Sequence, residues 1–410
     1  MIRIVWQQTE LCVFRVCGFG CTLFLFGVEK RMESIQEINE TRKPTRNSGI
    51  ELVKVIAILL IVCSHVVQTL GGGNSDYTLD LSTATTDWVR LLITMLRYSG
   101  ALGNTLFFVC SAWFLLDSKQ VSGQKIVSML LDVWIISVSI FAVVFFAKHG
   151  DLSLKMIVKS LFPTTFASNW YITCYLLFYP IHPTLNKVIA SMTQKTLFLT
   201  SFTLCFLYIG MNYIHGVFFS SALILWVAIY FLMAYMKIYM PKLMASRRAN
   251  FIGLLVGIVG NYGIILATNF LGLRLSFFEN KLLHWNNNCS PFLILIAISA
   301  LNLSRMASFH SKTINYISKL SLLIYVIHEN LLLRTYYRPM MWHQIYISVG
   351  YDHILLWILL MVVGLFLFGL VASIAYKYTL QRLVPPLSKK LCLGIGKGFD
   401  CMANMVMKIK

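Results

Sequence analysis

The fold is decided by the stretch Arg46-Asn47-Ser48-Gly49-Ile50-Glu51-Leu52-Val53-Lys54-Val55-Ile56-Ala57-Ile58-Leu59-Leu60-Ile61-Val62-Cys63-Ser64-His65. It is an apolar run of membrane-spanning character, with Glu51 and Lys54 at its entry and His65 deep inside it. At a helical rise of about 1.5 Å per residue, Lys54 and His65 lie about 16 Å apart, or about half the hydrocarbon thickness. An ionisable side chain at that depth is costly, so His65 is a candidate functional residue. The alternative is a structural histidine that a neighbouring helix or a lipid headgroup satisfies.

The composition extends this interpretation to the whole chain. Of the 410 residues, 58% are hydrophobic and 12% are charged, which is half the charged share of about 25% in a soluble domain. The net charge of +19 would suit a nucleic-acid partner, but Lys and Arg lie mostly in short segments between apolar runs, as membrane topology requires. The ten cysteines match no usual metal-site spacing, and we interpret all of them as small apolar residues. We therefore expect a multi-pass membrane protein with no nucleic-acid partner and no metal.

Ten apolar stretches are long enough to span, and they predict an all-α polytopic membrane protein. They are residues 50–70, 88–116, 127–147, 169–188, 197–214, 217–236, 251–273, 290–307, 315–333 and 353–376. Basic residues gather in alternate connections and in the tail, which predicts that both termini are cytoplasmic. Two connections that should lie outside are also basic, and they carry Lys148, Lys155 and Lys159, and Arg334 and Arg338. They are either re-entrant or surface-lying pieces near a functional site, or ordinary contacts with lipid headgroups.

The expected parts are a cytoplasmic N-terminal extension (1–45), a membrane domain (46–380) and a basic cytoplasmic tail (381–410). In the extension, an apolar run from Leu11 to Val28 is interrupted by Arg15 and lacks a small-residue cleavage site after it. We expect residues 1–31 to be dispensable or an artefact of start-site choice, and the alternative is a signal peptide.

A second histidine occurs in the ninth stretch, in Ser321-Leu322-Leu323-Ile324-Tyr325-Val326-Ile327-His328-Glu329-Asn330. This stretch runs outward like the first, so His328 also lies toward the outer half. Two histidines at similar depth on separate helices suit proton transfer, because imidazole titrates near neutral pH and can take a hydroxyl proton. The alternative is that His328 and Glu329 form a structural anchor at the outer interface.

The second and fourth stretches add polar and aromatic candidates. Arg97 lies inside the second stretch and needs a partner or water there. Asn104 and Ser111 add polar groups at membrane depth, among small residues that allow close helix contact. Trp170 and Tyr171 open the fourth stretch and are either site residues or ordinary interfacial aromatic residues.

These segments resemble, in order, motifs of the integral-membrane acyltransferases of the acyltransferase-3 group, particularly bacterial cell-surface polysaccharide O-acetyltransferases. The matching segments, within residues 46–380, are Lys54 to His65; Leu106-Phe107-Phe108 with Ser111-Ala112-Trp113; Trp170-Tyr171 with Tyr175, Tyr179 and Pro183; and Ile324-Tyr325-Val326-Ile327-His328. Each is weak alone, but four in order are a strong signal. The chain departs from the pattern at Lys54, where arginine is common, and at Ala112, which replaces glycine. It also lacks the Arg-rich entry to the third span.

The resemblance implies an O-acyltransferase of the bacterial plasma membrane. It would move an acyl group, usually acetyl, from cytoplasmic acyl-CoA to a hydroxyl of a cell-envelope polysaccharide or its lipid-linked precursor. Acetyl-CoA is then a substrate, and no bound cofactor is expected. A polysaccharide exporter or flippase is the alternative, but the missing internal repeat and the two histidine-bearing spans argue against it.

The expected roles follow from the same resemblance and from the residue types. The expected catalytic residues are His65, as base or transient acyl carrier, and His328. Lys54 and Arg97 are the expected donor-binding residues. The expected substrate-binding residues are Trp170, Tyr171, Tyr325, Glu329, Asn104 and Ser111.

Overall fold

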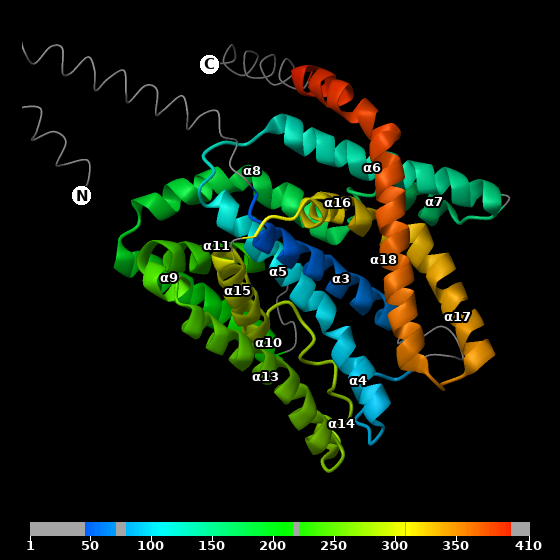
Figure 1. The fold of residues 1–410 in the computed structure, drawn as a ribbon, viewed down its shortest axis with the longest axis horizontal. Helices are drawn as coiled ribbons and strands as arrows, with labels where there is room; N and C mark the ends of the chain where they lie inside the picture. The colour runs from blue at the N-terminus through cyan, green and yellow to red at the C-terminus, as the bar shows by residue number, and fades with distance from the viewer. Residues whose placement is uncertain (1–45, 71–78, 149, 216–220, 308, 395–410) are drawn as a thin grey trace, which may run out of the picture. The chain divides into compact units, whose positions relative to one another are not determined.

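The computed structural model describes residues 46–70, 79–148, 150–215, 221–307 and 309–394. The chain divides into two units, Met1–Arg46 and Asn47–Lys410, and the account below concerns the second. Within the described residues this unit consists of helices and their connections, with no strand (Figure 1). The predicted N-terminal extension, up to residue 45, and the last part of the predicted tail, from residue 395, lie outside the described residues.

Six described helices are long and apolar enough to cross a membrane, or seven if one bent pair counts as a span. The six are α3 (Ser48–Leu70), α6 (Gly123–Ala147), the continuous run of α9, η1 and α10 (Gln194–His215), α11 (Ala222–Tyr239), α13 (Arg247–Gly272) and α18 (Ile354–Tyr378). The bent pair joins α16 (Lys312–His328) to η2 (Leu333–Tyr337) and α17 (Arg338–Val349) at an angle of 63°.

The remaining helices explain why the predicted count of ten spans is not confirmed. They are α4 (Trp88–Arg97), α5 (Ser99–Leu115), α7 (Leu154–Leu161), α8 (Trp170–Ser191), α12 (Pro241–Met244), α14 (Ser276–Glu279), α15 (Pro291–Met306) and η3 (Leu380–Leu383). The second predicted span divides at Tyr98 into α4 and α5, and α15 has only 16 residues. α8 contains Pro180 and Pro183, which have no backbone N–H to donate, and it is not among the six helices of sufficient length and hydropathy. The all-helical, multi-span prediction is confirmed.

α3 is the helix around which the others are arranged (Figure 1). It contacts α4, α5, α15, α16, α17 and α18. Of its most apolar window, 56% is buried inside the protein, the largest share among the six spanning helices. Ile58, Val62 and Val66 are completely buried. An apolar helix that is buried on most sides occupies the core of a bundle, so the opening stretch of the sequence forms the centre of the fold.

The residues that open α3 hold it against the start of α16. The Oδ1 of Asn47 accepts a hydrogen bond from the N–H of Gly49 at 2.8 Å and caps the helix. The Oγ of Ser48 donates to Oδ1 of Asn315 at 2.9 Å and accepts from the N–H of Ser311 at 2.8 Å. α3 and α16 therefore begin side by side and run in the same direction.

Small residues allow α5 to approach α3 closely, as the sequence predicted. A Cβ atom at Gly103 would lie 2.6 Å from the carbonyl oxygen of Ala57 and 2.7 Å from Cγ1 of Ile61. Helix association in membranes depends on such close packing, because lipid offers no hydrophobic driving force between helices.

Gly103→Leu is therefore expected to destabilise the protein by about 1–3 kcal/mol, the usual effect of overpacking. The measurement is the midpoint of thermal unfolding in detergent. Gly263→Leu in α13 is the matched control, because a Cβ there meets nothing within 4 Å. Equal midpoints for the two variants would contradict the close contact between α3 and α5.

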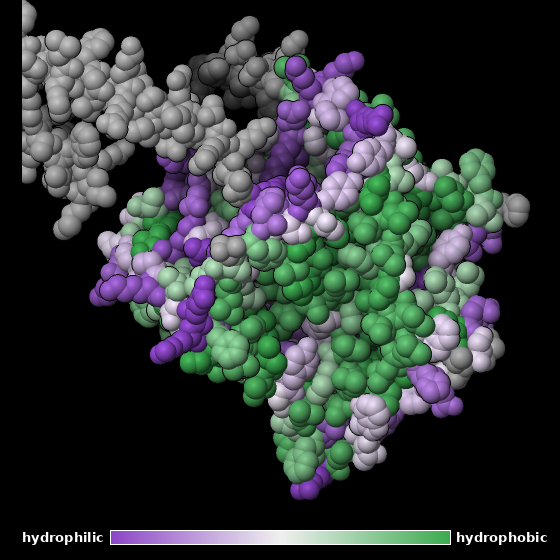
Figure 2. All heavy atoms as spheres, in the orientation of Figure 1, coloured by the Kyte–Doolittle hydropathy of each residue, from purple (hydrophilic) through white to green (hydrophobic). Residues whose placement is uncertain are grey.

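The surface carries a broad apolar face that includes α18, while hydrophilic residues gather toward the ends of the bundle (Figure 2). Large apolar side chains exposed along α18 include Leu356, Leu359, Val363, Leu367 and Val371. Such a surface is typical of helices that face lipid. The chain is a multi-pass membrane protein.

Candidate active site

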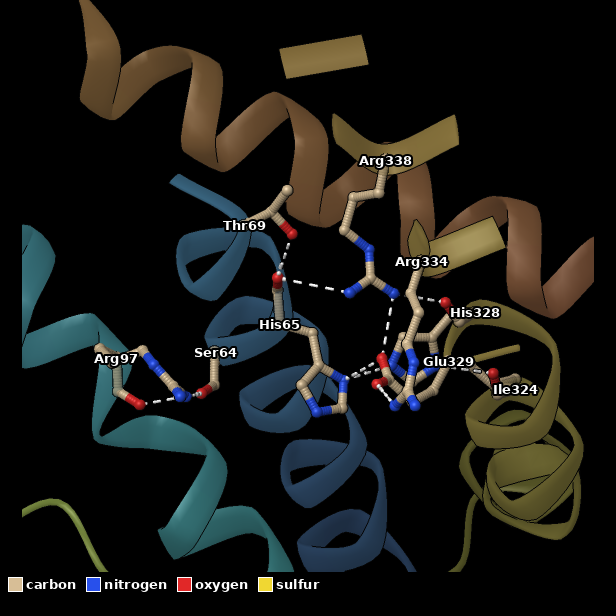
Figure 3. A network of polar contacts seen from close by, with 9 residues as sticks. All are labelled: Ser64, His65, Thr69, Arg97, Ile324, His328, Glu329, Arg334 and Arg338. Atoms are coloured by element: carbon tan, nitrogen blue, oxygen red, sulfur yellow. Dashed lines mark hydrogen bonds and ion pairs between the residues drawn. The ribbon is translucent and has the colours of Figure 1, made fainter. Parts of the chain in front are cut away.

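The two candidate histidines meet because α3 and α16 start at the same level. His65 follows Ser48 by 17 residues (65 − 48), and His328 follows Ser311 by 17 residues (328 − 311). At about 1.5 Å per residue, each histidine lies about 25 Å along its helix from the contact between the two starts. The Nδ1 of His65 is 3.1 Å from Nε2 of His328 (Figure 3). Because the two spacings are equal, two motifs that are distant in sequence lie side by side and form one site.

Hydrogen bonds assign the proton positions on the two rings. Nδ1 of His328 lies 2.7 Å from the carbonyl oxygen of Ile324, which only accepts, so this nitrogen carries a proton. Nε2 of a neutral His328 therefore presents a lone pair to Nδ1 of His65. Nδ1 of His65 also lies 2.9 Å from Oε2 of Glu329, a second acceptor, so Nδ1 of His65 is protonated. The lone pair of a neutral His65 is then on Nε2, which makes no hydrogen bond to any described residue.

The carboxylate of Glu329 joins His65 to two arginines (Figure 3). Nη1 of Arg334 lies 2.8 Å from Oε1, and Nη2 of Arg338 lies 3.0 Å from Oε2. The side chains of Glu329 and Arg338 are only 9% and 7% exposed. Buried charges require partners, and this arrangement supplies them on both oxygens of the carboxylate. Glu329, predicted from the sequence to bind substrate, is therefore held in place beside Nδ1 of His65, where a carboxylate can orient the ring and stabilise a positive charge on it.

α17 folds back and holds the end of α3 in place. Nη2 of Arg338 donates to the carbonyl oxygen of His328 at 2.6 Å, and Nη1 lies 3.5 Å from that of His65. Nε1 of Trp342 donates to the carbonyl oxygen of Val66 at 3.0 Å. The 63° bend after α16 is what brings these two side chains onto α3.

Sequence reasoning missed Arg334, Arg338 and Trp342 as site residues. The available signal was the positive charge of a connection that the topology rule places outside, where Arg334 and Arg338 were noted as exceptions. Nothing in the sequence indicated Trp342, because its role depends on the bend.

A cavity of about 200 Å³ lies toward the Lys54 end of the histidine pair. Of the predicted site residues, its lining includes Lys54, Ser111, Tyr171 and Tyr325. Lys319, which the sequence did not indicate, adds a second cation. The cavity thus combines Lys319 and Lys54 with hydroxyl groups from three different helices, and the charge of Lys54 is partly offset by Glu51, whose Oε2 lies 3.5 Å from its Nζ.

Three buried hydroxyl groups of this cavity lack partners. The Oη of Tyr171, the Oγ of Ser321 and the Oη of Tyr325 make no hydrogen bond to the described residues. Buried polar groups are almost always satisfied in folded proteins, so these three hydroxyls are suited to hydrogen-bond a polar ligand in the cavity.

The spacing between Lys54 and His65 places the histidine on the face of α3 that lines this cavity. Eleven residues at about 3.6 per turn amount to about three full turns, so both side chains lie on nearly the same face of α3. Ile61, one turn before His65, lines the cavity, as does Tyr325, whose ring centroid is 5.9 Å from that of His328. The cavity therefore ends one helical turn from the histidine pair.

Three predicted site residues lie outside both this cavity and the cluster of His65, His328 and Glu329. Nη1 of Arg97 donates to Oγ of Ser64 at 2.9 Å, and Arg97 lines a different cavity of about 240 Å³. Asn104 and Trp170 line a small void of about 10 Å³, which has room for about one water molecule. The structure thus places Arg97 beside the residue that precedes His65, and apart from Lys54. Its predicted contact with the donor stays a prediction.

The cluster also has the spacing of a metal site. His65, His328 and Glu329 each offer one ligand atom, and these atoms lie within 4.8 Å of one another. However, both carboxylate oxygens are already bonded to arginines, whose charges oppose a bound cation. The donor set therefore fits a polar hydrogen-bonded network better than a metal centre.

The comparisons with known proteins gave one match. The acyltransferase-3 family model, described as an acyltransferase domain, matches residues 47–377, which include all four motif-bearing segments. No curated protein and no solved structure matched the chain.

Proposed function

We propose that this chain, which belongs to the acyltransferase-3 family, is a membrane O-acetyltransferase. It moves an acetyl group from cytoplasmic acetyl-CoA to a hydroxyl of a cell-envelope polysaccharide or its lipid-linked precursor, in the bacterial plasma membrane. The cavity beside Lys54 is the main support for a donor of this chemistry. It offers cations for phosphate groups and orphan hydroxyls for the carbonyl and amide groups of a thioester arm.

The size of the cavity suggests which part of the donor enters it. Pockets that enclose a drug-sized molecule measure about 300–1,000 Å³. At about 200 Å³, this cavity suits one end of acetyl-CoA, namely the thioester and part of the pantetheine arm. Lys319 is exposed, so the phosphates would stay at the mouth, near Lys54 and Lys319.

The Nε2 lone pair of His65 can act in either of two ways. As a base, it takes the acceptor hydroxyl proton while that oxygen attacks the thioester carbonyl, the C–S bond breaks and the thiolate leaves, later receiving the proton. As an acyl carrier, Nε2 itself attacks the carbonyl and releases the thiolate, and the acceptor oxygen then takes the acyl group while its proton goes to the thiolate. In both cases His65 becomes cationic, and Glu329 stabilises that charge through Nδ1–H.

The test uses the purified full-length chain with acetyl-CoA and a preparation of envelope glycan. The expected result is glycan-dependent release of CoA together with base-labile acetyl label on the glycan. A stoichiometric burst of CoA release before acceptor is added would indicate the acyl carrier, and its absence would indicate the base. Glycan movement across a vesicle membrane without CoA release would support the exporter alternative and refute the proposal.

Lys54→Met and Lys319→Met are each expected to raise KM for acetyl-CoA about 5- to 10-fold and to change kcat little, because the charges contact the donor but not the reacting atoms. Steady-state CoA release measures both constants. Lys187→Met, at an exposed lysine of α8 away from the cavity, is the control. A KM equal to that of the wild type in both cavity variants would place donor binding elsewhere.

A further inference from the structure

A second cavity, larger and apolar, lies on the other side of His328. It measures about 500 Å³ and lies between the segment Leu333–Ile345 and α18. His328 and Arg338 form its polar end, and aromatic side chains of Tyr337, Trp357 and Phe368 contribute to its walls. Because His328 and Glu329 are neighbours, this cavity ends at the same cluster that orients His65.

The cavity opens on the face of the protein that contacts lipid. Leu360 and Phe368, which line it, are 48% and 50% exposed, and Gly364 between them is also exposed. This part of α18 belongs to the broad apolar face in Figure 2. A hydrocarbon chain can therefore enter from the bilayer without crossing water.

The inner end of the cavity carries excess positive charge. Arg338 lines the cavity, and it shares the single carboxylate of Glu329 with Arg334, which lies beside the cavity and not in its lining. Two guanidinium groups on one carboxylate leave one net positive charge at this end. Only Nη1 of Arg334 is bonded to Glu329, and its side chain is 34% exposed. Guanidinium groups pair readily with phosphate oxygens, so the charge complements a phosphate headgroup.

Resting on the proposed function, we infer that this cavity binds an acceptor carried on a single-chain lipid phosphate. The hydrocarbon chain lies between α17 and α18, and the phosphate lies at Arg334 and Arg338. The sugar attached to the phosphate then presents its hydroxyl near His65. Of the two acceptors in the proposed function, this arrangement selects the lipid-linked precursor over the free polysaccharide. It also gives a role to the basic connection that violates the positive-inside pattern.

Gly364 provides a direct test of the cavity. A Cβ added to Gly364 meets nothing within 4 Å, so Gly364→Phe fills the cavity without forcing the backbone to move. Gly263→Phe in α13 is the matched control, because its Cβ position is equally open and lies outside the cavity. Thermal unfolding in detergent should give similar midpoints for both variants and the wild type.

The probe is tritiated farnesyl phosphate, bound to the full-length chain in nanodiscs. We expect saturable binding to the wild type and to Gly263→Phe, and a Kd at least tenfold higher for Gly364→Phe. Farnesol should bind at least tenfold more weakly than farnesyl phosphate, and Arg334→Met should reduce that preference. Equal binding to Gly364→Phe and the wild type would overturn the inference, as would equal competition by dioleoyl phosphatidic acid, which would mark an ordinary phospholipid groove.

Release of CoA from acetyl-CoA separates the two proposals. If farnesyl phosphate binds as expected but no CoA is released with any acceptor, the proposed function fails and the lipid site stands. If CoA is released with soluble glycan while Gly364→Phe binds the probe like the wild type, the lipid site fails and the proposed function stands. Tight binding of palmitoyl-CoA that Gly364→Phe abolishes, without binding of farnesyl phosphate, would assign the cavity to a donor acyl chain and overturn the inference.

Discussion

His65→Ala is expected to lower acyl transfer by about 10²- to 10⁴-fold, the usual contribution of a positioned acid–base group. The reason is that Nε2 of His65 is the ring nitrogen of the histidine pair that keeps a lone pair and makes no hydrogen bond to the described residues. The measurement is kcat for CoA release in the presence of acceptor. His310→Ala, at an exposed histidine outside the helices, should behave like the wild type.

Two further measurements separate chemistry from structure at this position. The KM for acetyl-CoA should stay within about twofold of the wild type in His65→Ala, because Lys54 and Lys319 are untouched. Added imidazole should restore part of the rate, since it can occupy the vacated space and accept a proton. Full O-acetylation by His65→Ala in cells would refute the catalytic assignment.

Glu329→Gln is expected to impair both stability and catalysis. Removing one partner of a buried ion pair typically costs about 3–5 kcal/mol, because the remaining charge is left uncompensated. Here two arginines would lose their shared carboxylate, and the cationic form of His65 would lose its partner. We expect a lower midpoint of thermal unfolding and a fall in kcat of about 10²-fold or more.

A second substitution distinguishes the two effects. Arg334→Gln in the Glu329→Gln background removes one unpaired cation, so it should recover part of the lost stability but none of the lost activity. Glu279→Gln, at an exposed glutamate of α14, is the control for removing a carboxylate. Recovery of activity in the double variant would show that Glu329 acts only through charge balance, and would end its assigned role toward His65.

Much of the fold was predictable from local sequence. The apolar runs predicted an all-helical membrane protein, and the depth of His65 and His328 along their helices predicted similar levels. That prediction works because rise per residue is nearly constant in a helix, so distance along the axis is counted from the sequence. Such counting compares two helices only if they start at the same level. The hydrogen bonds of the opening Asn47-Ser48-Gly49 give α3 and α16 this common starting level.

The features that escaped prediction depend on bends and on the rotation of helices about their axes. The break at Tyr98 and the 63° bend after α16 have no proline at the break itself and changed the number of spans. Asn104 and Trp170 point into a small void instead of the cavity because rotation about the helix axis is set by packing partners. Trp342 contacts Val66 across 276 positions of sequence, which no local pattern records.

The cluster of His65, His328 and Glu329, in which His65 is half-buried and the other two are buried, also bears on how material passes through the bilayer. The cluster lies between the two cavities. Tyr325 lines the cavity on one side of it, and Arg338 lines the cavity on the other side. An alternating-access carrier would have to open this cluster in every cycle and break its ion pairs each time. An enzyme that transfers only a small acyl group from a donor on one side to an acceptor on the other can keep this cluster closed. On the proposed function, turnover would then need neither opening of the cluster nor rocking of one half of the bundle against the other.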